Sequence, residues 1–384
     1  MKGTRVLDLT HVLAGPFGTY LLALLGADVI KIEPPGEPDE VRGRGNRPDL
    51  NDRQMGTNYL TQGSNKKAIT LNLKSAEGQQ IFRDLARTAD VIVENYRAGA
   101  LAGLGLGYDD IRKVQPGIIY CSLTGFGQTG ERARVNAYDN VIQAASGLMS
   151  LTGTSETAPV KTDASIVDYA SGMNAAFAIA AALFRRERTG EGVYIDCSML
   201  DSALLLMGTQ VTADSPLQPP MGNHQKEAGL GCYETADGLL MLGAFNRRQH
   251  ERLWNLLGRP DFAEKSSWTE MAEYAPQMKA ELTRRLTERP AEDWEVFLHV
   301  HGIPAERVRT VREGVTLADG ATPPFTSPLE SFNVRVPAMP FRFSSGGPEI
   351  TGPPPEMGQH NREILTGLGY SDEEIRQLQL AGII

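Results

Sequence analysis

The stretch VLDLTHVLAGPFGTYLLALLGADVIKIE, residues 6–33, decides the fold of this chain. The short apolar runs at its two ends have the length of buried strands, and residues 16–26 between them are apolar enough for a helix against a core. Pro16 near the first turn and Gly26 at the end are typical helix start and stop residues. A strand, a helix and a second strand in this order predict two parallel strands joined by a crossover helix.

The same alternation continues through the first half of the chain. Residues 68–73, 90–96 and 118–124 (AITLNL, DVIVENY and IIYCSLT) have the pattern of strands, and residues 75–89 and 108–114 that of helices. A chain that returns repeatedly to the same edge forms a parallel sheet with helices on both faces. We therefore expect a doubly wound α/β domain.

The composition of the sequence changes near residue 210. Residues 213–229 carry frequent Pro and Gly and are typical of a linker or loop. The stretch YETADGLLMLGA predicts a hairpin that turns at Asp237-Gly238, and the helical patterns after it indicate a smaller α+β domain. We place the first part of the large domain at residues 1–205, the linker and small domain at residues 206–324, and a return to the large domain at residues 325–384.

Composition excludes several classes of protein. The 384 residues are 41% hydrophobic and 22% charged, which is globular, and the net charge of −9 argues against a general nucleic-acid binder. Cys121, Cys197 and Cys232 form no CxxC pair, so we expect a reducing cytoplasm, no zinc site and no disulfide framework. Asp8 interrupts the apolar region that a signal peptide would need, and the longest apolar runs look too short to span a bilayer.

Two motifs have ordinary structural interpretations. Residues 125–130, GFGQTG, match GxGxxG, but a charged segment follows them instead of an apolar helix, so a turn is favoured over a dinucleotide site. His299 and His301 are two residues apart, yet no Cys or carboxylate lies at ligand spacing. We expect surface histidines and no metal.

Basic residues gather near predicted strand ends. In a parallel sheet, the loops after the carboxyl ends of the strands line the ligand crevice, so cations there could bind a phosphorylated ligand. A solvated surface is the alternative. The residues are Arg42, Arg44, Arg47, Lys66, Lys67, Lys74 and Arg97.

Asp168 stands at the head of the nearly apolar segment 169–188. Its carboxylate could be a helix N-cap that accepts backbone N–H groups, a contribution of about 1 kcal/mol. The same position at a helix N-terminus would stabilise the carboxylate as an anion, which is the form that a nucleophile needs. Residue chemistry alone leaves both readings open.

A family resemblance covers nearly the whole chain. The sequence resembles the class III CoA-transferases, which include formyl-CoA:oxalate and carnitine CoA-transferases and share their fold with alpha-methylacyl-CoA racemases. The resemblance lies in these stretches, in order: LDLTHVLAGP, LLGADVIKIEPP, SNKKAITLNLKSAEG, ADVIVENYRAGAL, GLGY, SLTGFGQTG, YDNVIQAASGLMSLTG, IVDYASG, AALFRRERTGEG, VYIDCSMLD, YETADG and PPPEMGQHNREIL.

The resemblance implies a large domain built from both chain ends, a smaller middle domain, and a homodimer whose chains interlock. It also implies that Asp168, in IVDYASG, is the covalent nucleophile, passing through an aspartyl anhydride and an aspartyl-CoA thioester. Acyl-CoA and small carboxylic acids would be the substrates. Coenzyme A would take part as a substrate, and no cofactor would be tightly bound.

The same matching implies the binding residues. CoA contacts fall on Val12, Leu13, Ala14, Leu71, Asn72, Leu73, Lys74, Asn95, Tyr96 and Arg97. Substrate contacts fall on Tyr138, His224 and Glu234, and His224, Lys226 and Arg47 are candidates for a second carboxylate of a dicarboxylic acid. The chain departs from the family at Leu13, where the oxalate enzyme has Gln, and at Pro34, Gly103 and Asn136, where basic CoA contacts are expected.

Two other functions stay open. A racemase needs two acid–base groups on opposite sides of the alpha carbon. The chain has Asp168 and Glu234, but Tyr138 stands where the racemase histidine is expected, and a neutral tyrosine is a poor base at pH 7. A non-catalytic CoA-binding protein is the third reading, against which the retained Asp168 argues.

Overall fold

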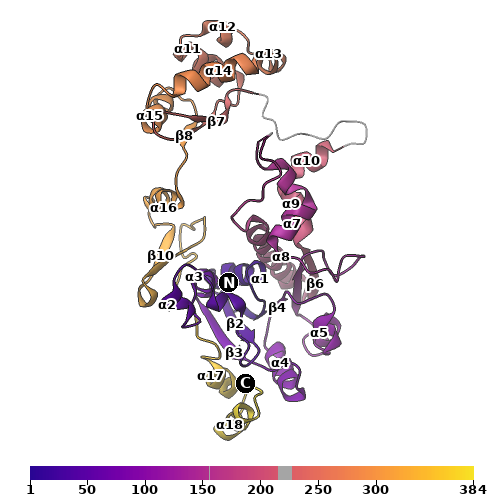
Figure 1. Ribbon diagram of the computed structural model, residues 1–384. Helices are drawn as coiled ribbons and strands as arrows, with labels where there is room; N and C mark the ends of the chain where they lie inside the picture. The colour runs from indigo at the N-terminus through magenta and orange to yellow at the C-terminus, as the bar shows by residue number, and fades with distance from the viewer. Residues whose placement is uncertain (155, 215–226) are drawn as a thin grey trace. The chain divides into compact units, whose positions relative to one another are not determined.

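The computed structural model describes residues 1–154, 156–214 and 227–384 (Figure 1). The chain divides into two compact units. Unit 1 comprises Met1–Met221 and Pro323–Ile384, and unit 2 comprises Gly222–Thr322. Both ends of the chain therefore contribute to unit 1.

A six-stranded sheet forms the centre of unit 1. Its order is β3-β2-β1-β4-β5-β6, and every neighbouring pair is parallel. Val6 pairs with Val29 on one side and with Val91 on the other. The predicted α/β fold with a parallel sheet is thus confirmed. The strands are β1 (Arg5–Leu9), β2 (Asp28–Glu33), β3 (Lys66–Thr70), β4 (Val91–Glu94), β5 (Ile119–Thr124) and β6 (Val193–Ser198).

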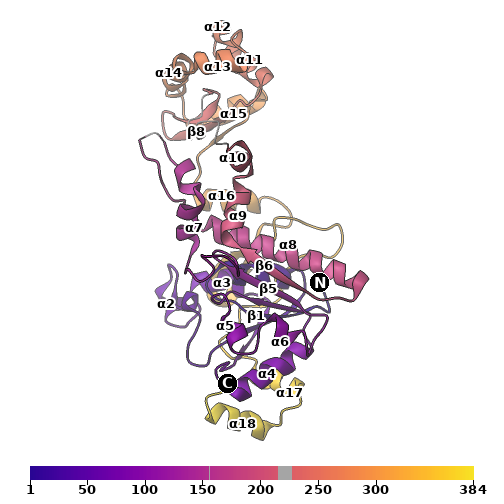
Figure 2. The same cartoon turned by 90° about the vertical axis from the view of Figure 1, so that its right-hand side faces the viewer.

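Helices cover both faces of the sheet because alternate strand residues point to opposite sides. Leu7 and Ile92 pack toward one group of helices, and Val6 and Val93 toward the other. Figure 2 shows the two layers on either side of the strands. The first group is α4 (Ala76–Arg87), α5 (Ala100–Gly103), α6 (Tyr108–Ile111), α17 (Asn361–Gly367) and α18 (Asp372–Leu380); the second is α1 (Ala14–Leu24), α7 (Asp139–Ser146), α8 (Ile166–Thr189) and α9 (Met199–Leu206).

The helix α8 corrects one expectation. It has 24 residues with a mean hydropathy of 1.4 in its most apolar window, so by length and composition alone it could cross a membrane. Its sequence had looked too short. Nine of its residues are buried in unit 1, where α8 packs on α1. A Cβ on Gly172 would lie 2.6 Å from the Ala14 carbonyl oxygen, so glycine permits this close approach. Core packing accounts for the apolar face that is buried.

Smaller elements complete unit 1. The segment after β2 and the returning chain share an apolar cluster that includes Leu50, Tyr59 and Phe332. These elements are η1 (Glu40–Gly43), α2 (Pro48–Asn51), α3 (Thr57–Gly63), η2 (Leu148–Leu151), α10 (Gly208–Ala213), β10 (Thr326–Leu329), η3 (Glu330–Phe332) and β11 (Val334–Pro337).

Unit 2 has its own apolar core around Trp254 and Leu282. The predicted hairpin is present: β7 pairs antiparallel with β8, and the connection includes Asp237-Gly238. The elements are β7 (Leu230–Glu234), β8 (Leu239–Gly243), α11 (Arg247–Leu256), α12 (Pro260–Ala263), α13 (Trp268–Glu273), α14 (Ala275–Leu286), α15 (Ala291–Val300), β9 (Ala305–Arg307) and α16 (Val311–Asp319).

Candidate active site

A cavity of about 450 Å³ lies at the carboxyl ends of the central strands. Residues 11–14 after β1, residues 95–98 after β4 and residues 123–125 at the end of β5 line it, together with Asp168. The strand order reverses between β1 and β4. Ligands of open α/β sheets bind at this kind of switch point. The geometry therefore brings Asp168 to the expected ligand crevice.

Asp168 is not the N-cap of its helix. The helix begins at Ile166, so Asp168 is its third residue, and the N-cap Ser165 makes no side-chain capping bond. Instead Asp139, on α7, accepts the backbone N–H groups of Val167 at 2.7 Å and of Asp168 at 3.0 Å. The capping role considered for Asp168 thus belongs to Asp139, which leaves the Asp168 side chain free to face the cavity.

The pKa of Asp168 is raised to about 7, first by burial and then by the negative charge of Asp139. This corrects the expectation that the helix N-terminus makes the anion especially stable. A carboxylate with a higher pKa is a stronger base and nucleophile, and at pH 7 to 8 about half or more of it remains ionised.

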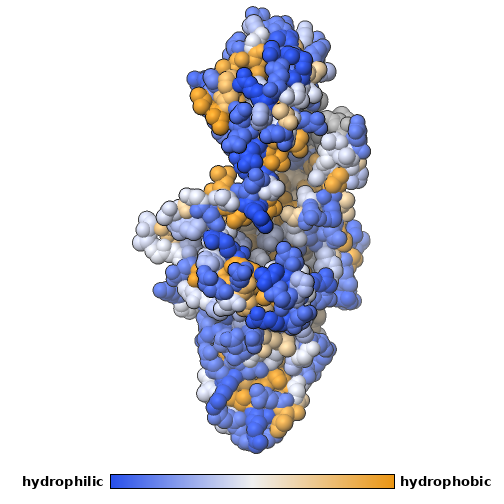
Figure 3. Space-filling view, turned by 60° about the vertical axis from the view of Figure 1, so that its left-hand side comes forward, coloured by the Kyte–Doolittle hydropathy of each residue, from blue (hydrophilic) through white to orange (hydrophobic). Residues whose placement is uncertain are grey.

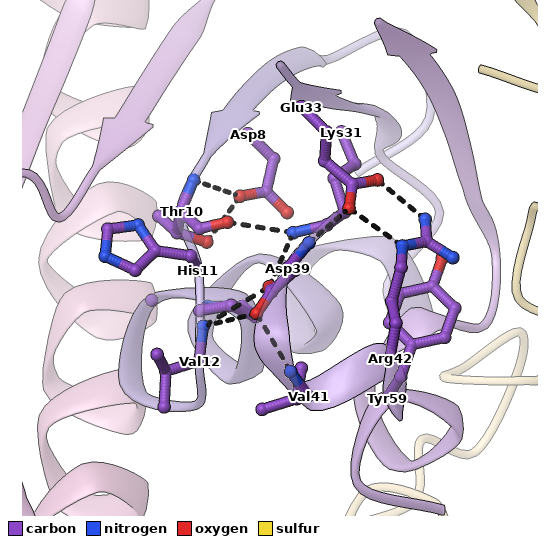
Figure 4. A network of polar contacts seen from close by, with 12 residues as sticks. Asp8, Thr10, His11, Val12, Lys31, Glu33, Asp39, Val41, Arg42 and Tyr59 are labelled. Carbon is purple, nitrogen blue, oxygen red and sulfur yellow. Dashed lines mark hydrogen bonds and ion pairs between the residues drawn. The ribbon is translucent and has the colours of Figure 1, made fainter. Parts of the chain in front are cut away.

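The loop between β1 and α1 is shaped by side chains from other elements (Figure 4). Thr10 N–H donates to Asp8, and the Thr10 carbonyl accepts from Lys31 Nζ at 2.9 Å. Both backbone groups of His11 pair with the amide of Asn95, at 2.9 and 2.8 Å. The loop therefore obtains its hydrogen bonds from side chains that the sheet positions.

Val12 follows in an unusual conformation. Its φ is +68°, and a β-branched residue in this left-handed region costs about 1–2 kcal/mol. The two carboxylate oxygens of Asp39 lie 3.1 and 3.2 Å from its N–H, and Gln62 donates to its carbonyl. Asp39 in turn lies 3.1 Å from the buried ammonium of Lys31. The surrounding structure thus holds Val12 against its own preference.

The helix α1 begins directly after this loop without a side-chain cap. Among the described residues, the N–H groups of Leu13, Ala14 and Gly15 donate to no oxygen. Leu13 and Ala14 line the same cavity as Asp168. Uncapped N–H groups and the helix dipole favour negative charge at this end.

A second cavity of about 340 Å³ opens beside the first, and Tyr96 lines both. Leu71, Asn72, Leu73 and Lys74 line the second cavity, together with apolar residues of α5. The expected CoA contacts are therefore divided between two neighbouring cavities. Leu71 to Lys74 lie in the second cavity, and Val12, Leu13, Ala14, Asn95 and Arg97 in the first.

Most of the basic residues expected at this edge are paired elsewhere. Arg42 and Lys66 are buried and bind Glu33 at 2.6 Å and Asp8 at 2.9 Å. The other paired residues are Arg44 with Glu40, Arg47 with Asp49, and Lys67 with Glu363. The interpretation of the whole set as phosphate ligands is therefore wrong. Of that set, Lys74 and Arg97 line the cavities.

The expected substrate residues separate into three groups. Tyr138 lines the cavity of Asp168 and is 62% exposed. Glu234 lies on β7 in unit 2, and His224 lies outside the described residues, as does Lys226. Arg47 is occupied by Asp49, which argues against its role toward a second carboxylate.

Residues 125–130 form a turn, and of the two histidines His299 is exposed whereas His301 is half-buried with its Nδ1 2.7 Å from the Phe297 carbonyl oxygen. Residues 125–130 follow β5 and lead to no helix before α7, and Gly127 and Gly130 both have positive φ. His299 lies 3.4 Å from Glu306, and the part of the chain that the structure describes holds no cluster of metal-ligating residues.

Sequence reasoning missed four residues at the site: Asp39, Gln62, Arg134 and Asp139. Arg134 lines the cavity, and no carboxylate of the described residues pairs with it. It lies two positions before Asn136, where a basic contact was expected. Asp139 stands beside Tyr138 in a stretch that was already of interest, so its place at a helix start was a usable signal.

Known proteins resemble this chain over its full length. The family model described as CoA-transferase family III matches residues 1–361. Succinyl-CoA:glutarate CoA-transferase of Mus musculus is 36% identical, and the match covers 100% of this chain and 90% of that protein. Acetyl-CoA:oxalate CoA-transferase of Acetobacter aceti is also 36% identical, with 89% and 88% covered.

A solved structure supports the same relationship. The crystal structure of a CaiB/BaiF family protein from Brucella suis has a TM-score of 0.82 to this chain at 29% identity. The match covers 96% of this chain and 98% of that one. The family expected from the sequence is confirmed.

Proposed function

The chain belongs to CoA-transferase family III, and we propose that it moves CoA between two carboxylic acids through covalent intermediates on Asp168. The observation that supports this role best is the position of Asp168 in a cavity at the sheet's switch point. Its own carboxylate is spared from capping because Asp139 performs that task.

The proposed cycle keeps an activated acyl group at each stage, either as a thioester or as a mixed anhydride. An Asp168 oxygen attacks the acyl-CoA carbonyl, the C–S bond breaks, and a mixed anhydride and CoA thiolate form. The thiolate attacks the Asp168 carbonyl carbon, and the donor acid leaves as a carboxylate. The acceptor carboxylate then attacks the aspartyl-CoA thioester, and the same steps in reverse release the new acyl-CoA. Covalent catalysis divides one exchange into near-balanced steps.

Each addition places negative charge on a carbonyl oxygen. The unbonded N–H groups of Leu13 and Ala14 line the cavity beside Asp168 and are suitable donors to that oxyanion. Preorganised donors of this kind can lower a barrier by several kcal/mol. Leu13 contributes here through its backbone, so the Gln that the oxalate enzyme has at this position is not needed for this task.

We place CoA across both cavities. The apolar walls of the 340 Å³ cavity suit the adenine base, and Lys74 in its lining suits a phosphate. Tyr96, shared by both cavities, would lie beside the connecting chain, and the thioester would reach the 450 Å³ cavity with Asp168.

We propose dicarboxylic acids as the exchanged acids. The two relatives named above carry succinate, glutarate or oxalate in their names, each at 36% identity over most of this chain. The cavity also offers Arg97 and Arg134, which could bind a second carboxylate. Succinyl-CoA with glutarate is therefore the first pair to assay.

We also propose a homodimer with interlocked chains in a reducing compartment such as the cytoplasm. Phe177, Phe184 and Leu205, on α8 and α9, are 77%, 61% and 70% exposed, which is costly for an isolated chain. Figure 3 shows apolar side chains reaching the surface in several places on one face. The three cysteines are free thiols. Light scattering should give twice the 41.8 kDa chain mass.

Mass spectrometry tests the covalent mechanism. Wild-type protein is mixed with succinyl-CoA, reduced with borohydride, digested and mapped. We expect reduction of the thioester to an alcohol on the peptide that contains Asp168, and none in Asp168→Ala. Turnover of succinyl-CoA and glutarate with no modified peptide, or with modification elsewhere, would contradict the assignment. Alpha-proton exchange of a 2-methylacyl-CoA without transfer would favour the racemase reading.

A further inference from the structure

Residues 10–12 have an unusual pattern of hydrogen bonds. Each backbone N–H and C=O of these three residues is bound by a side chain, and those side chains come from widely separated parts of the sequence. The next two N–H groups, of Leu13 and Ala14, are left open at the cavity. The side chains are those of Asp8, Lys31, Asn95, Asp39 and Gln62.

At Val12 these hydrogen bonds hold a backbone conformation that the residue itself disfavours. Its φ of +68° lies in a region that β-branched residues avoid, whereas glycine adopts it freely. Without external bonds, the residue would return to negative φ and turn Leu13 and Ala14 away from their present positions. The bonds to Val12 therefore determine where the open N–H groups lie.

Asp39 is the group best placed to hold Val12. Its carboxylate receives the Val12 N–H on both oxygens and also accepts the Val41 N–H at 3.3 Å. Lys31 fixes it from behind at 3.1 Å, and the same ammonium binds the Thr10 carbonyl. Asp39 is 8% exposed and Lys31 1% exposed, so this pair is shielded from water.

We propose that Asp39 is a positioning residue for CoA transfer: held by Lys31, it keeps Val12 left-handed and so sets the open N–H groups of Leu13 and Ala14 beside Asp168. This inference rests on the proposed function. Asp39 itself acts only through the backbone of Val12, and the reacting atoms need not touch it.

A rescue experiment tests the proposal in the full-length protein. Asp39→Asn keeps the size of the side chain but loses the ion pair and one of the two acceptors. We expect kcat/KM for succinyl-CoA and glutarate to fall about 30-fold, because misplaced groups cost one to two orders of magnitude. Adding Val12→Gly should raise kcat/KM again by at least about fivefold, because glycine adopts positive φ without the bonds from Asp39.

Asp90→Asn is the matched control. Asp90 also accepts a backbone N–H, that of Arg5 at 2.7 Å, and pairs with Arg186 at 2.8 Å, but at the amino ends of the strands. It should lower the unfolding midpoint while changing kcat/KM less than about threefold. Equal kinetic effects of Asp39→Asn and Asp90→Asn, or no gain from Val12→Gly, would overturn the proposal.

A second variant covers the case in which Asp39→Asn does not fold. Gln62→Met removes the bond to the Val12 carbonyl, and the buried Gln62 Oε1 has no partner among the described residues, so its loss costs little. We expect about a tenfold loss of kcat/KM that Val12→Gly reverses. No loss in Gln62→Met would contradict the proposal.

Calorimetric titration of wild type with CoA alone separates this inference from the proposed function. If wild type binds CoA but does not exchange the two acids, the choice of acids fails. The inference is then judged by CoA affinity, which should fall at least about fivefold in Asp39→Asn and recover with Val12→Gly. An unchanged affinity would count against it.

Discussion

The Asp139 carboxylate lies 3.0 Å from the backbone nitrogen of Asp168 and also caps the preceding N–H, so one acidic residue fixes the helix that carries another. Gln143 donates to the second oxygen of Asp139 and holds it in place. Asp139 therefore affects both the position of Asp168 and its electrostatic surroundings. The bond that orients the backbone at Asp168 also brings a negative charge that raises the Asp168 pKa.

Asp139→Ala should therefore lower activity for two separable reasons. Loss of the cap costs about 1 kcal/mol of helix stability, and Asp168 loses its fixed position. We expect a drop in kcat of at least about tenfold, since positioning acts on the chemical step. Steady-state kinetics and thermal unfolding together check this. Asp139→Glu, which keeps the charge but displaces it, should lose kcat as well; full activity in either variant would contradict the role.

The pH dependence of transfer follows from the raised pKa of Asp168. Only the carboxylate attacks, so kcat/KM should rise through an apparent pKa of about 7 and level off above pH 8. Removing the neighbouring charge in Asp139→Asn should move the midpoint to lower pH, while burial keeps it above the ordinary value of 3.8. Rate profiles from pH 5 to 9, roughly two units either side of the midpoint, measure both values. A flat profile would mean that Asp168 does not titrate in the free enzyme.

The raised pKa of Asp168 should make the free energy of unfolding depend on pH. The folded-state pKa of Asp168 is above the unfolded value of 3.8, so the folded state binds more protons and stability falls as pH rises from about 4 to about 7. Asp168→Asn removes that cost. We expect its free energy of unfolding at pH 8 to exceed that of wild type by on the order of 1–2 kcal/mol, and the difference to disappear below pH 4. Urea denaturation at both pH values checks it.

Asp201→Asn is the control for that comparison, because Asp201 occupies the first turn of α9 but is exposed. It should give no gain at pH 8. An equal gain in both variants would assign the effect to lost charge in general.

Local patterns predicted the sheet because its signals are local. Most strands of the six-stranded sheet come from short, largely apolar runs that are followed by Gly, Pro or a polar turn, and the hairpin at Asp237-Gly238 is specified by two residues. The start of α8 was misplaced by three residues. Ser165 is a common type of N-cap residue, but its side chain makes no capping bond here, and Asp139 accepts the Val167 N–H instead. Capping from another helix is a tertiary property.

The charged residues show the same limit. Arg42 and Lys66 looked like ligand cations, but buried strands β1 and β2 contain Asp8 and Glu33, which need partners inside. Acidic residues within apolar strands were the signal for this pairing, although only the fold shows which basic residue pairs with which acidic residue. Asp168 itself was identified through the family resemblance, since its chemistry alone left two readings.

Glu94 offers a pH effect that is independent of Asp168. It is 5% exposed at the end of β4, and burial raises its pKa to about 7 against the bonds from Ser122 and the Tyr96 N–H. Wild type should lose stability as pH rises from the ordinary value of 4.5 to about 7, because over that range the folded state keeps the Glu94 proton and the unfolded state does not. Glu94→Gln can still accept the Tyr96 N–H, so it should be more stable at pH 8 by on the order of 2 kcal/mol. Parallel unfolding curves at pH 6 and 8 measure the difference, and identical pH slopes would refute it.

Arg134 should determine part of the affinity for the anionic substrates. It lines the Asp168 cavity with no carboxylate partner among the described residues, so Arg134→Ala removes a cation without freeing an acid. We expect KM for acyl-CoA or for the acceptor acid to rise about tenfold with kcat little changed, and the dependence of kcat/KM on salt to become weaker. Arg132→Ala is the matched control on the same loop, because Arg132 lies over the ring of Phe126 at 4.5 Å. Equal KM changes in the two variants would show that the loop's net charge matters rather than the position of Arg134.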